Sequence, residues 1–215
     1  MRSLPFFREQ TAHPDRSERT RMRIILASKS PRRREILELL GLDFTVETAD
    51  TDESCDIREP GELVAALAAK KGEAVIEKKL AAGEDISDAL FIACDTLVYV
   101  DGEFLGKPRD REDAYGMLSK LSGKSHEVWS GIYVYFGGKA VSCAEVTRVN
   151  FCDMTHEEKE RYLDSGEPFD KAGAYAVQGK AAVYIKGLEG DYFNVVGLPV
   201  NLLYNTLKNE FGIVI

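Results

Sequence analysis

Near its start the chain has a strand pattern that leads directly into a helix pattern, and this feature constrains the fold most. Residues 23–28 contain an unbroken apolar run at 24–27, which is typical of a buried strand. Ser30 can cap a helix, Pro31 suits the first helical position, and Gly41 suits the helix end. A buried strand followed at once by a helix indicates a layered fold in which helices cover a sheet.

Helix and strand patterns mix along the rest of the chain. Helices are predicted at residues 60–80, 110–123 and 155–166 and after Pro199. Strands are predicted at residues 44–48, 90–100, 174–178 and 181–186, and in a long hairpin at 126–151. Two apolar runs make up the segment at 90–100, and Asp95 and Thr96 interrupt them. The pattern predicts an α/β or α+β protein with a mixed sheet.

Composition and charge exclude several classes of protein. The 215 residues are 44% hydrophobic and 30% charged, which is ordinary for a globular protein with a substantial core. The net charge of −8 argues against a general nucleic-acid-binding protein, because such proteins need a strongly basic face. No apolar run approaches the length of a membrane-spanning helix, so no membrane segment is predicted.

The cysteines and histidines do not have the spacing of a metal site. The cysteines are scattered, without a C-x-x-C pair, at Cys55, Cys94, Cys143 and Cys152. The three histidines show no paired spacing either. The simplest interpretation is free thiols in a reducing compartment, so we expect a cytoplasmic protein.

Residues 1–21 differ from the rest of the chain. They are polar and rich in arginine, and they lack the apolar stretch of a secretory signal. Their acidic residues, Glu9, Asp15 and Glu18, are unusual in a targeting peptide. We therefore expect one domain over residues 22–215, preceded by a disordered extension or an upstream start.

Positive charge gathers at the start of the first predicted helix. Arg32 and Arg33 follow the turn that contains Ser28. The first N–H groups of a helix can bind an anion, and arginine binds phosphate through paired N–H groups. Arginines at this position oppose the helix dipole unless an anion compensates. A phosphate site is therefore favoured over a solvated basic turn.

Lys71 and Asp95 interrupt apolar patterns. Lys71 stands in a helix stripe with Leu67 and Val75, either as a lysine that reaches solvent at the helix edge or as a second cation for the same anion. Asp95 could hold a metal ion or act as a general base, and the alternative is a turn aspartate that caps N–H groups. The apolar runs around Asp95 favour the functional role.

Three further residues are weaker candidates. Glu53 lies in an acidic loop and could add an oxygen ligand for a hard cation such as Mg²⁺, although most such loops are only solvated. Lys107 lies in a Gly-Lys-Pro sequence that is common in loops. Gln178 lies in a glycine-rich segment and offers a donor and an acceptor that could read a base edge. The alternative for this segment is a glycine-rich turn before a strand.

Five stretches of the chain resemble, in this order, the Maf family of nucleotide pyrophosphatases: LASKSPRRREIL, CDTLVYVDGEFLGKP, MLSKLSGKSHEV, SGEPFDKAGAYAVQG and YFNVVGLPV. The resemblance implies a mixed α/β fold with an elongated central sheet flanked by helices. It also implies two lobes with a cleft, similar to inosine triphosphate pyrophosphatases. Family members cleave nucleoside triphosphates to the monophosphate and pyrophosphate with a divalent cation, Mg²⁺ or Mn²⁺.

The resemblance also implies roles for individual residues. Asp95 is the expected general base that activates water, and Glu53 joins Asp95 near the metal ion. The expected phosphate-binding residues are Ser28, Arg32, Arg33, Lys71 and Lys107. The positions tied to base choice are Arg32, Thr96 and Gln178.

The family divides by substrate. The branch that prefers dTTP and UTP has the pattern found here from Asp170 to Gly179, whereas a branch acting on 7-methyl-GTP differs in that loop and has Trp-Arg after the proline. Arg32 and Lys171 therefore favour the dTTP/UTP branch. Cys94 and Ala176 are departures, at positions where a smaller residue and glycine, respectively, are common.

Alternative functions stay open on the sequence alone. One is the same chemistry on another base, including modified nucleotides. A second is a regulator that binds a triphosphate without cleaving it, because the family is associated with inhibition of septum formation. A third is a phosphate-binding scaffold without enzymatic activity. The long hairpin arms also make a homodimer an expectation.

Overall fold

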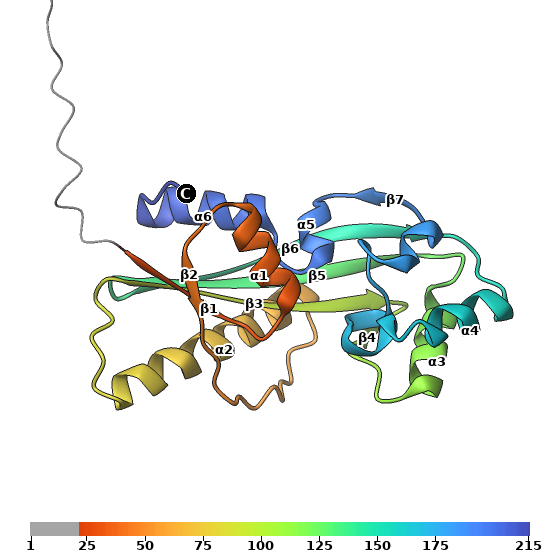
Figure 1. Ribbon diagram of the computed structural model, residues 1–215, viewed down its shortest axis with the longest axis horizontal. Coiled ribbons are helices and arrows are strands. Elements are labelled where there is room, and N and C mark those ends of the chain that lie inside the picture. The colour runs from red at the N-terminus through yellow and green to blue at the C-terminus, as the bar shows by residue number, and fades with distance from the viewer. Residues whose placement is uncertain (1–21) are drawn as a thin grey trace, which may run out of the picture.

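The computed structural model describes residues 22–215, and the expectations for residues 1–21 lie outside this range. A seven-stranded sheet runs along the long axis of the described part, with helices on both of its faces (Figure 1). Six strands follow one another in the spatial order β2 (Phe44–Val46), β1 (Arg23–Ala27), β3 (Ala89–Val100), β5 (Ser125–Phe136), β6 (Lys139–Phe151) and β7 (Ile185–Glu189). The short strand β4 (Glu103–Leu105) pairs with β3.

The sheet is mixed, as the sequence predicts. β1 is parallel to both β2 and β3, whereas the pairs β3–β5, β5–β6 and β6–β7 are antiparallel. The helices are α1 (Pro31–Leu39), α2 (Pro60–Ala81), α3 (Arg111–Leu121), α4 (His156–Asp164), α5 (Tyr192–Val196) and α6 (Val200–Phe211). None of the helices in residues 22–215 is long and apolar enough to span a lipid bilayer.

Side chains of the parallel strands alternate between two apolar layers, because successive residues of a strand point to opposite faces. Leu26 of β1 and Ile92 of β3 pack in the same cluster as buried residues of α1 and α6. Ile25 and Phe91 pack in the cluster that contains the buried face of α2. Asp95 and Thr96, the neighbouring polar residues of β3, follow the same alternation, so their side chains point to opposite faces of the sheet.

A third apolar cluster lies at the other end of the sheet. It joins the far end of β3 to α3, α4 and the segment after α4, and its members include Val98, Leu118, Tyr162 and Tyr175. Figure 1 shows α3, α4 and β4 at this end, away from α2 and α6. β3 and β5 run through both ends and connect the clusters.

The structure corrects the prediction that two polar residues interrupt the segment at 90–100. β3 is one continuous strand from Ala89 to Val100, and Asp95 and Thr96 pair in register with Gly131 and Ser130 of β5. The backbone N–H and C=O groups of these residues bond to the neighbouring strand β5, and this pairing does not depend on whether the side chains are polar. The alternative that Asp95 caps a turn is therefore wrong.

The strands predicted at 174–178 and 181–186 are also wrong for most of their length. The chain instead forms three short 3-10 helices, η2 (Glu167–Asp170), η3 (Ala172–Ala174) and η4 (Lys180–Tyr184), and β7 begins only at Ile185. Gly173 and Ala174 have φ values of 67° and 60°, which lie outside the range of a regular strand. The alternative of a glycine-rich turn describes the backbone of this segment better.

Close packing of α2 on β5 leaves no room for a side chain at Gly131. A Cβ atom there would lie 2.2 Å from the backbone oxygen of Val64 in α2. We expect Gly131→Ala to lower the free energy of unfolding by about 1–3 kcal/mol, because α2 must shift away from the sheet. Urea denaturation measures this change.

The matched control is Gly116→Ala in α3, where a Cβ atom would meet no atom within 4 Å. This change is expected to stabilise the protein by about 0.5–1 kcal/mol, because alanine loses less backbone entropy in a helix. Wild-type stability of Gly131→Ala would contradict the close contact between α2 and β5.

Candidate active site

One edge of β3 is open for a short length, and this gap creates the site. β1 pairs with β3 only as far as Ala93, and β4 pairs with it only from Val98 onward. Between these points, residues 94–97 have β5 on one side and no strand of the described chain on the other. A sheet edge beyond the carboxyl end of a parallel strand is a common position for ligand sites in α/β proteins.

A cavity of about 690 Å³ borders this gap. Its walls come from the β1–α1 loop, the loop after β2, α2, β3, the residues after β4, and the segments before and after β7. All nine residues that the sequence analysis named as site candidates line it: Ser28, Arg32, Arg33, Glu53, Lys71, Asp95, Thr96, Lys107 and Gln178. The tertiary structure therefore brings together residues that are up to 150 positions apart in the chain.

The cavity is more basic than the rest of the molecule. Six basic and four acidic residues line it, whereas the whole chain has a net charge of −8. Four of these ten residues, Lys29, Lys171, Asp50 and Asp170, were not among those that the sequence pointed to as binding or catalytic residues. Such a local excess of positive charge attracts an anionic ligand to this position.

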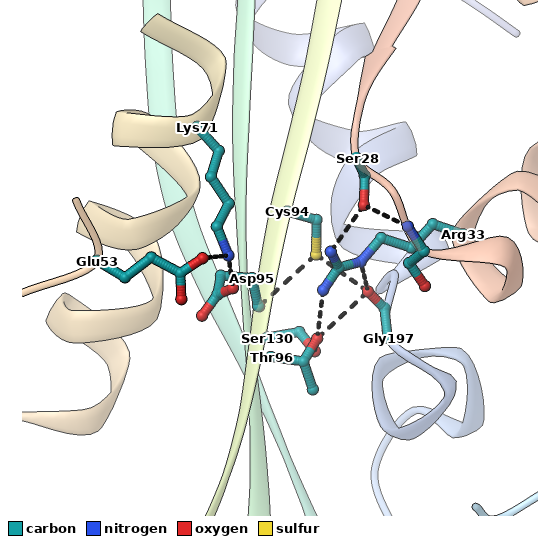
Figure 2. Close-up of polar contacts among 10 residues, drawn as sticks. Ser28, Arg33, Glu53, Lys71, Cys94, Asp95, Thr96, Ser130 and Gly197 are labelled. Carbon is teal, nitrogen blue, oxygen red and sulfur yellow. Dashed lines mark hydrogen bonds and ion pairs between the residues drawn. The ribbon is translucent and has the colours of Figure 1, made fainter. Parts of the chain in front are cut away.

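Asp95 points to the α2 side of β3, the same side as Lys71 and Glu53 (Figure 2). Its side chain is 11% exposed and accepts a short hydrogen bond from Lys71 of α2. The Lys71 ammonium also lies 3.0 Å from Oε1 of Glu53. Two carboxylates thus converge on one cation, and Lys71 does not extend into solvent as the alternative interpretation required.

Arg33 lies on the opposite side of β3 and connects three parts of the chain (Figure 2). Its Nε donates to the carbonyl oxygen of Gly197 at 2.8 Å. Its Nη1 and Nη2 donate to the hydroxyls of Ser28 and Thr96, each at 3.0 Å. Arg33 is 9% exposed, so these bonds form with little competition from water. They hold the β1–α1 loop, β3 and the α5–α6 connection together.

The hydroxyl of Thr96 continues this network into β5. It lies 2.8 Å from Oγ of Ser130, which in turn donates to the carbonyl oxygen of Asn194 at 3.0 Å. Thr96 therefore contacts other protein groups through its hydroxyl, and it sits beside the cavity as part of a rigid wall. The sequence analysis missed Ser130 and Gly197, although the Gly-Leu-Pro sequence at 197–199 was a signal for a fixed turn.

Arg32 extends toward the segment that contains Gln178. Its Nη1 lies 3.1 Å from Oδ2 of Asp170, and the Arg32 side chain is 20% exposed. Lys171 also donates to the Asp170 carboxylate. Burial opposes ionisation of Asp170, but the hydrogen bonds from Lys171 and Arg32 outweigh it and lower the pKa of Asp170. Arg32 is thus held by an ionised carboxylate at the edge of the cavity.

Lys107 and Gln178 line the part of the cavity formed by the segments after β4 and α4, and both are exposed. The two segments are joined by a backbone hydrogen bond of 3.0 Å from the N–H of Gly173 to the carbonyl oxygen of Gly106. Lys107 is therefore adjacent in sequence to the point that anchors the Gln178 segment.

A buried aromatic pair lies beneath the Gln178 segment. Tyr175 is 5% exposed, lines the cavity, and has its hydroxyl 2.7 Å from Nε2 of His126, which is 3% exposed. Burial raises the pKa of Tyr175 and lowers the pKa of His126 to about 4. Both side chains are neutral near pH 7, so the pair positions the wall of the cavity without adding charge.

The carboxylates fit a hard divalent cation that is shared with a ligand. Asp95 and Glu53 converge on one point, and Mg²⁺ commonly takes one or two carboxylates together with substrate phosphates. The described residues contain no group of three or more His, Cys, Asp or Glu side chains that could hold a metal ion by themselves. The donor set therefore suits a metal that arrives with a phosphate ligand.

The chain belongs to the family described as Maf-like protein, whose model matches residues 23–210. Three relatives carry the name dTTP/UTP pyrophosphatase. The Pelotomaculum thermopropionicum protein is 50% identical over 88% of this chain and 96% of its own. The proteins of Caldanaerobacter subterraneus and Carboxydothermus hydrogenoformans are each 46% identical over 89% of this chain, and over 91% and 100% of their own lengths.

One solved structure with a distant similarity is that of the Staphylococcus aureus Ham1 protein. It is 15% identical, has a TM-score of 0.47, and matches 87% of this chain and 99% of that chain.

Replacement of the two arginines should separate their roles. Arg33→Lys keeps the charge but cannot make all three hydrogen bonds to Gly197, Ser28 and Thr96. We expect this change to lower the free energy of unfolding by about 2 kcal/mol or more, because buried acceptors lose their donor. Chemical denaturation of the purified variant measures this loss.

Arg32→Lys is the matched control. Within residues 22–215, the Arg32 side chain has one hydrogen-bond partner, the half-exposed Asp170. An ion pair of this exposure contributes about 0–1 kcal/mol, so the stability of Arg32→Lys should stay close to that of the wild type. Equal stability losses in the two variants would contradict the structural role of Arg33.

Burial of His126 should make the protein less stable in acid. The folded-state pKa of about 4 lies below the ordinary value of 6.5, so the unfolded chain binds the proton more readily between these pH values. Stability is complete above the higher value and falls as the pH decreases toward the lower one. The His126 contribution to this loss is about 3 kcal/mol at most.

The measurement compares unfolding free energies of the wild type and His126→Gln over that pH range. The variant should lose less stability on acidification, because glutamine does not titrate. His156→Gln, at an exposed position, is the control and should follow the wild type. Parallel pH profiles for all three proteins would show that His126 does not titrate as the burial predicts.

Proposed function

We propose that this protein hydrolyses dTTP and UTP to the nucleoside monophosphate and pyrophosphate. The observation that carries the proposal is the convergence of Asp95 and Glu53 on Lys71, in a basic cavity of an otherwise acidic chain. The arrangement supplies a carboxylate base and several cations beside one another. Membership of the Maf-like family and the names of the relatives support the same activity.

The first step of the proposed mechanism is binding of the triphosphate. Phosphate oxygens would be bound by Lys107, Arg32, Lys71 and the first turn of α1, because these groups line the cavity and no side chain of residues 22–215 caps the start of α1. Arg33, with Ser28, would contribute mainly by fixing this turn, although a guanidinium has more N–H donors than its three bonds use. As Lys71 turns toward the phosphates, its hydrogen bond to Asp95 is released and the carboxylate is free to accept a proton from water.

Hydrolysis then follows by attack of water on the α-phosphorus. Asp95 accepts a proton from the water as the new phosphorus–oxygen bond forms. The bond from the α-phosphorus to the bridging oxygen breaks, and its electron pair leaves with pyrophosphate. Lys71, Lys107 and Arg32 stabilise the negative charge that develops on the oxygens.

Glu53 and Asp95 are the residues that would hold a divalent cation, Mg²⁺ or Mn²⁺, together with the phosphates. When bound, such an ion supplies additional positive charge to the triphosphate and orients it. Selection of the base is assigned to Arg32, Thr96 and Gln178. Gln178 offers a donor and an acceptor, which match the carbonyl and N–H groups that uracil and thymine share.

Asp95→Asn tests the proposed reaction. We expect turnover to fall by about 100- to 10,000-fold, because the amide cannot accept the proton from water. The assay measures pyrophosphate and orthophosphate release from dTTP, UTP, CTP, 7-methyl-GTP and purine triphosphates with Mg²⁺ or Mn²⁺. Pyrophosphate from dTTP and UTP, lost in the variant, is the expected result.

The matched control is Asp101→Asn, at an exposed turn aspartate that pairs with Lys124. It should retain wild-type turnover. Normal activity of Asp95→Asn would refute its role as the base. Tight triphosphate binding by a wild-type protein that releases no product would instead support a nucleotide-binding regulator.

A further inference from the structure

Gln178 stands on a turn whose position depends on contacts outside the cavity. The N–H of Gly179 donates to the carbonyl oxygen of Ala176 at 3.2 Å, which closes a turn over residues 176–179. Gln178 occupies the third position of this turn, and its side chain is exposed at the cavity. No strand or helix of the described chain includes residues 176–179, so side chains must fix their place.

Glu167 holds the end of this turn. Both of its carboxylate oxygens lie 3.0 Å from the N–H of Lys180. The carboxylate also lies directly beneath Gly179, where a Cβ atom would come within 2.3 Å of Oε1. The glycine therefore lets the backbone approach the carboxylate closely, and the N–H two residues after Gln178 is bound.

Tyr162 holds the beginning of the turn. Its hydroxyl accepts a hydrogen bond of 3.3 Å from the N–H of Ala176 and donates one of 2.8 Å to Oε1 of Glu167. Burial and the Glu167 carboxylate raise the pKa of the Tyr162 phenol, which keeps this proton in place. Tyr162 is 3% exposed and packs in the apolar cluster with α3. This packing fixes the position of its ring and therefore of its hydroxyl.

We propose that Tyr162 and Glu167 are positioning residues for base selection, which act by fixing the backbone on both sides of Gln178. They bind the N–H groups two residues before and two residues after it, and neither residue lines the cavity. The inference rests on the proposed hydrolysis of UTP and on the proposed role of Gln178. Recognition of the base by Gln178 requires a fixed backbone, because a small displacement of the Gln178 side-chain amide changes which atoms of the base it contacts.

UTP and CTP are the substrates that test this inference. Their bases differ at the edge where uracil presents an N–H and a carbonyl oxygen and cytosine presents a ring nitrogen and an amino group. We expect Tyr162→Phe and Glu167→Gln to lower the ratio of kcat/KM for UTP over CTP by about 10-fold or more. A general loss of folding would lower both values together and leave the ratio unchanged.

A double-mutant cycle identifies the route of the effect. If Tyr162 acts through Gln178, the Tyr162→Phe change should lower the ratio in the wild type and have no further effect on it in Gln178→Ala. Equal effects in both backgrounds would overturn the inference. An unchanged ratio in both Tyr162→Phe and Glu167→Gln would overturn it as well.

Tyr115→Phe is the matched control for loss of a hydroxyl. Tyr115 packs against the same apolar cluster, and its hydroxyl contacts His156 at 3.0 Å and not the turn. This variant should keep the wild-type ratio of UTP to CTP. A fall in the ratio equal to that of Tyr162→Phe would indicate a general effect of the cluster and would overturn the specific role.

Hydrogen exchange separates failure of this inference from failure of the proposed function. The amides of Ala176 and Lys180 should exchange faster in Tyr162→Phe and Glu167→Gln than in the wild type or in Tyr115→Phe. If the wild type does not hydrolyse UTP, the proposed function fails, and so does the base-selection role. Unchanged exchange in an active enzyme would refute the anchoring alone.

Discussion

The open edge of β3 is the constraint on which the rest of the structure depends. β1 ends beside Ala93 and β4 begins beside Val98, so within residues 22–215 a short length of β3 has a partner strand on one side only. β5 pairs continuously along the other edge and keeps this length straight and fixed. The cavity exists because loops, rather than another strand, fill the space beside residues 94–97.

Consecutive side chains of β3 point to opposite faces of the sheet, and this separates two functions within the site. Asp95 and Thr96 are neighbours, and their side chains point to opposite faces of the sheet. On one face, Asp95 and Glu53 both contact Lys71, and the three side chains form a charged group suited to catalysis. On the other, Thr96 meets Arg33 and forms a buried network suited to rigidity. The wall of the cavity and its reactive group are thus built from consecutive residues.

Much of the fold and of the candidate site could be predicted from local patterns. Ser28, Arg32 and Arg33 stood out because a buried strand led directly to a helix start, and Lys71 and Asp95 because they broke apolar patterns. The contacts of Arg33 with Gly197 and of Tyr162 with Ala176 had no such signal. These contacts join segments that are distant in the sequence, and no local pattern indicates that such segments lie side by side in the fold.

The sequence by itself determined the succession of helices and strands outside the segment at 167–184, the family resemblance and the residue types of the site. Hydrophobic periodicity and helix capping depend on residues that are close in the sequence, so both can be recognised without a structure. Only the tertiary structure decided that β3 is continuous through Asp95 and that the segment around Gln178 is a held turn. Pairing with β5 imposed the first. Side chains from α4 and η2 imposed the second, because the turn has no backbone ladder of its own.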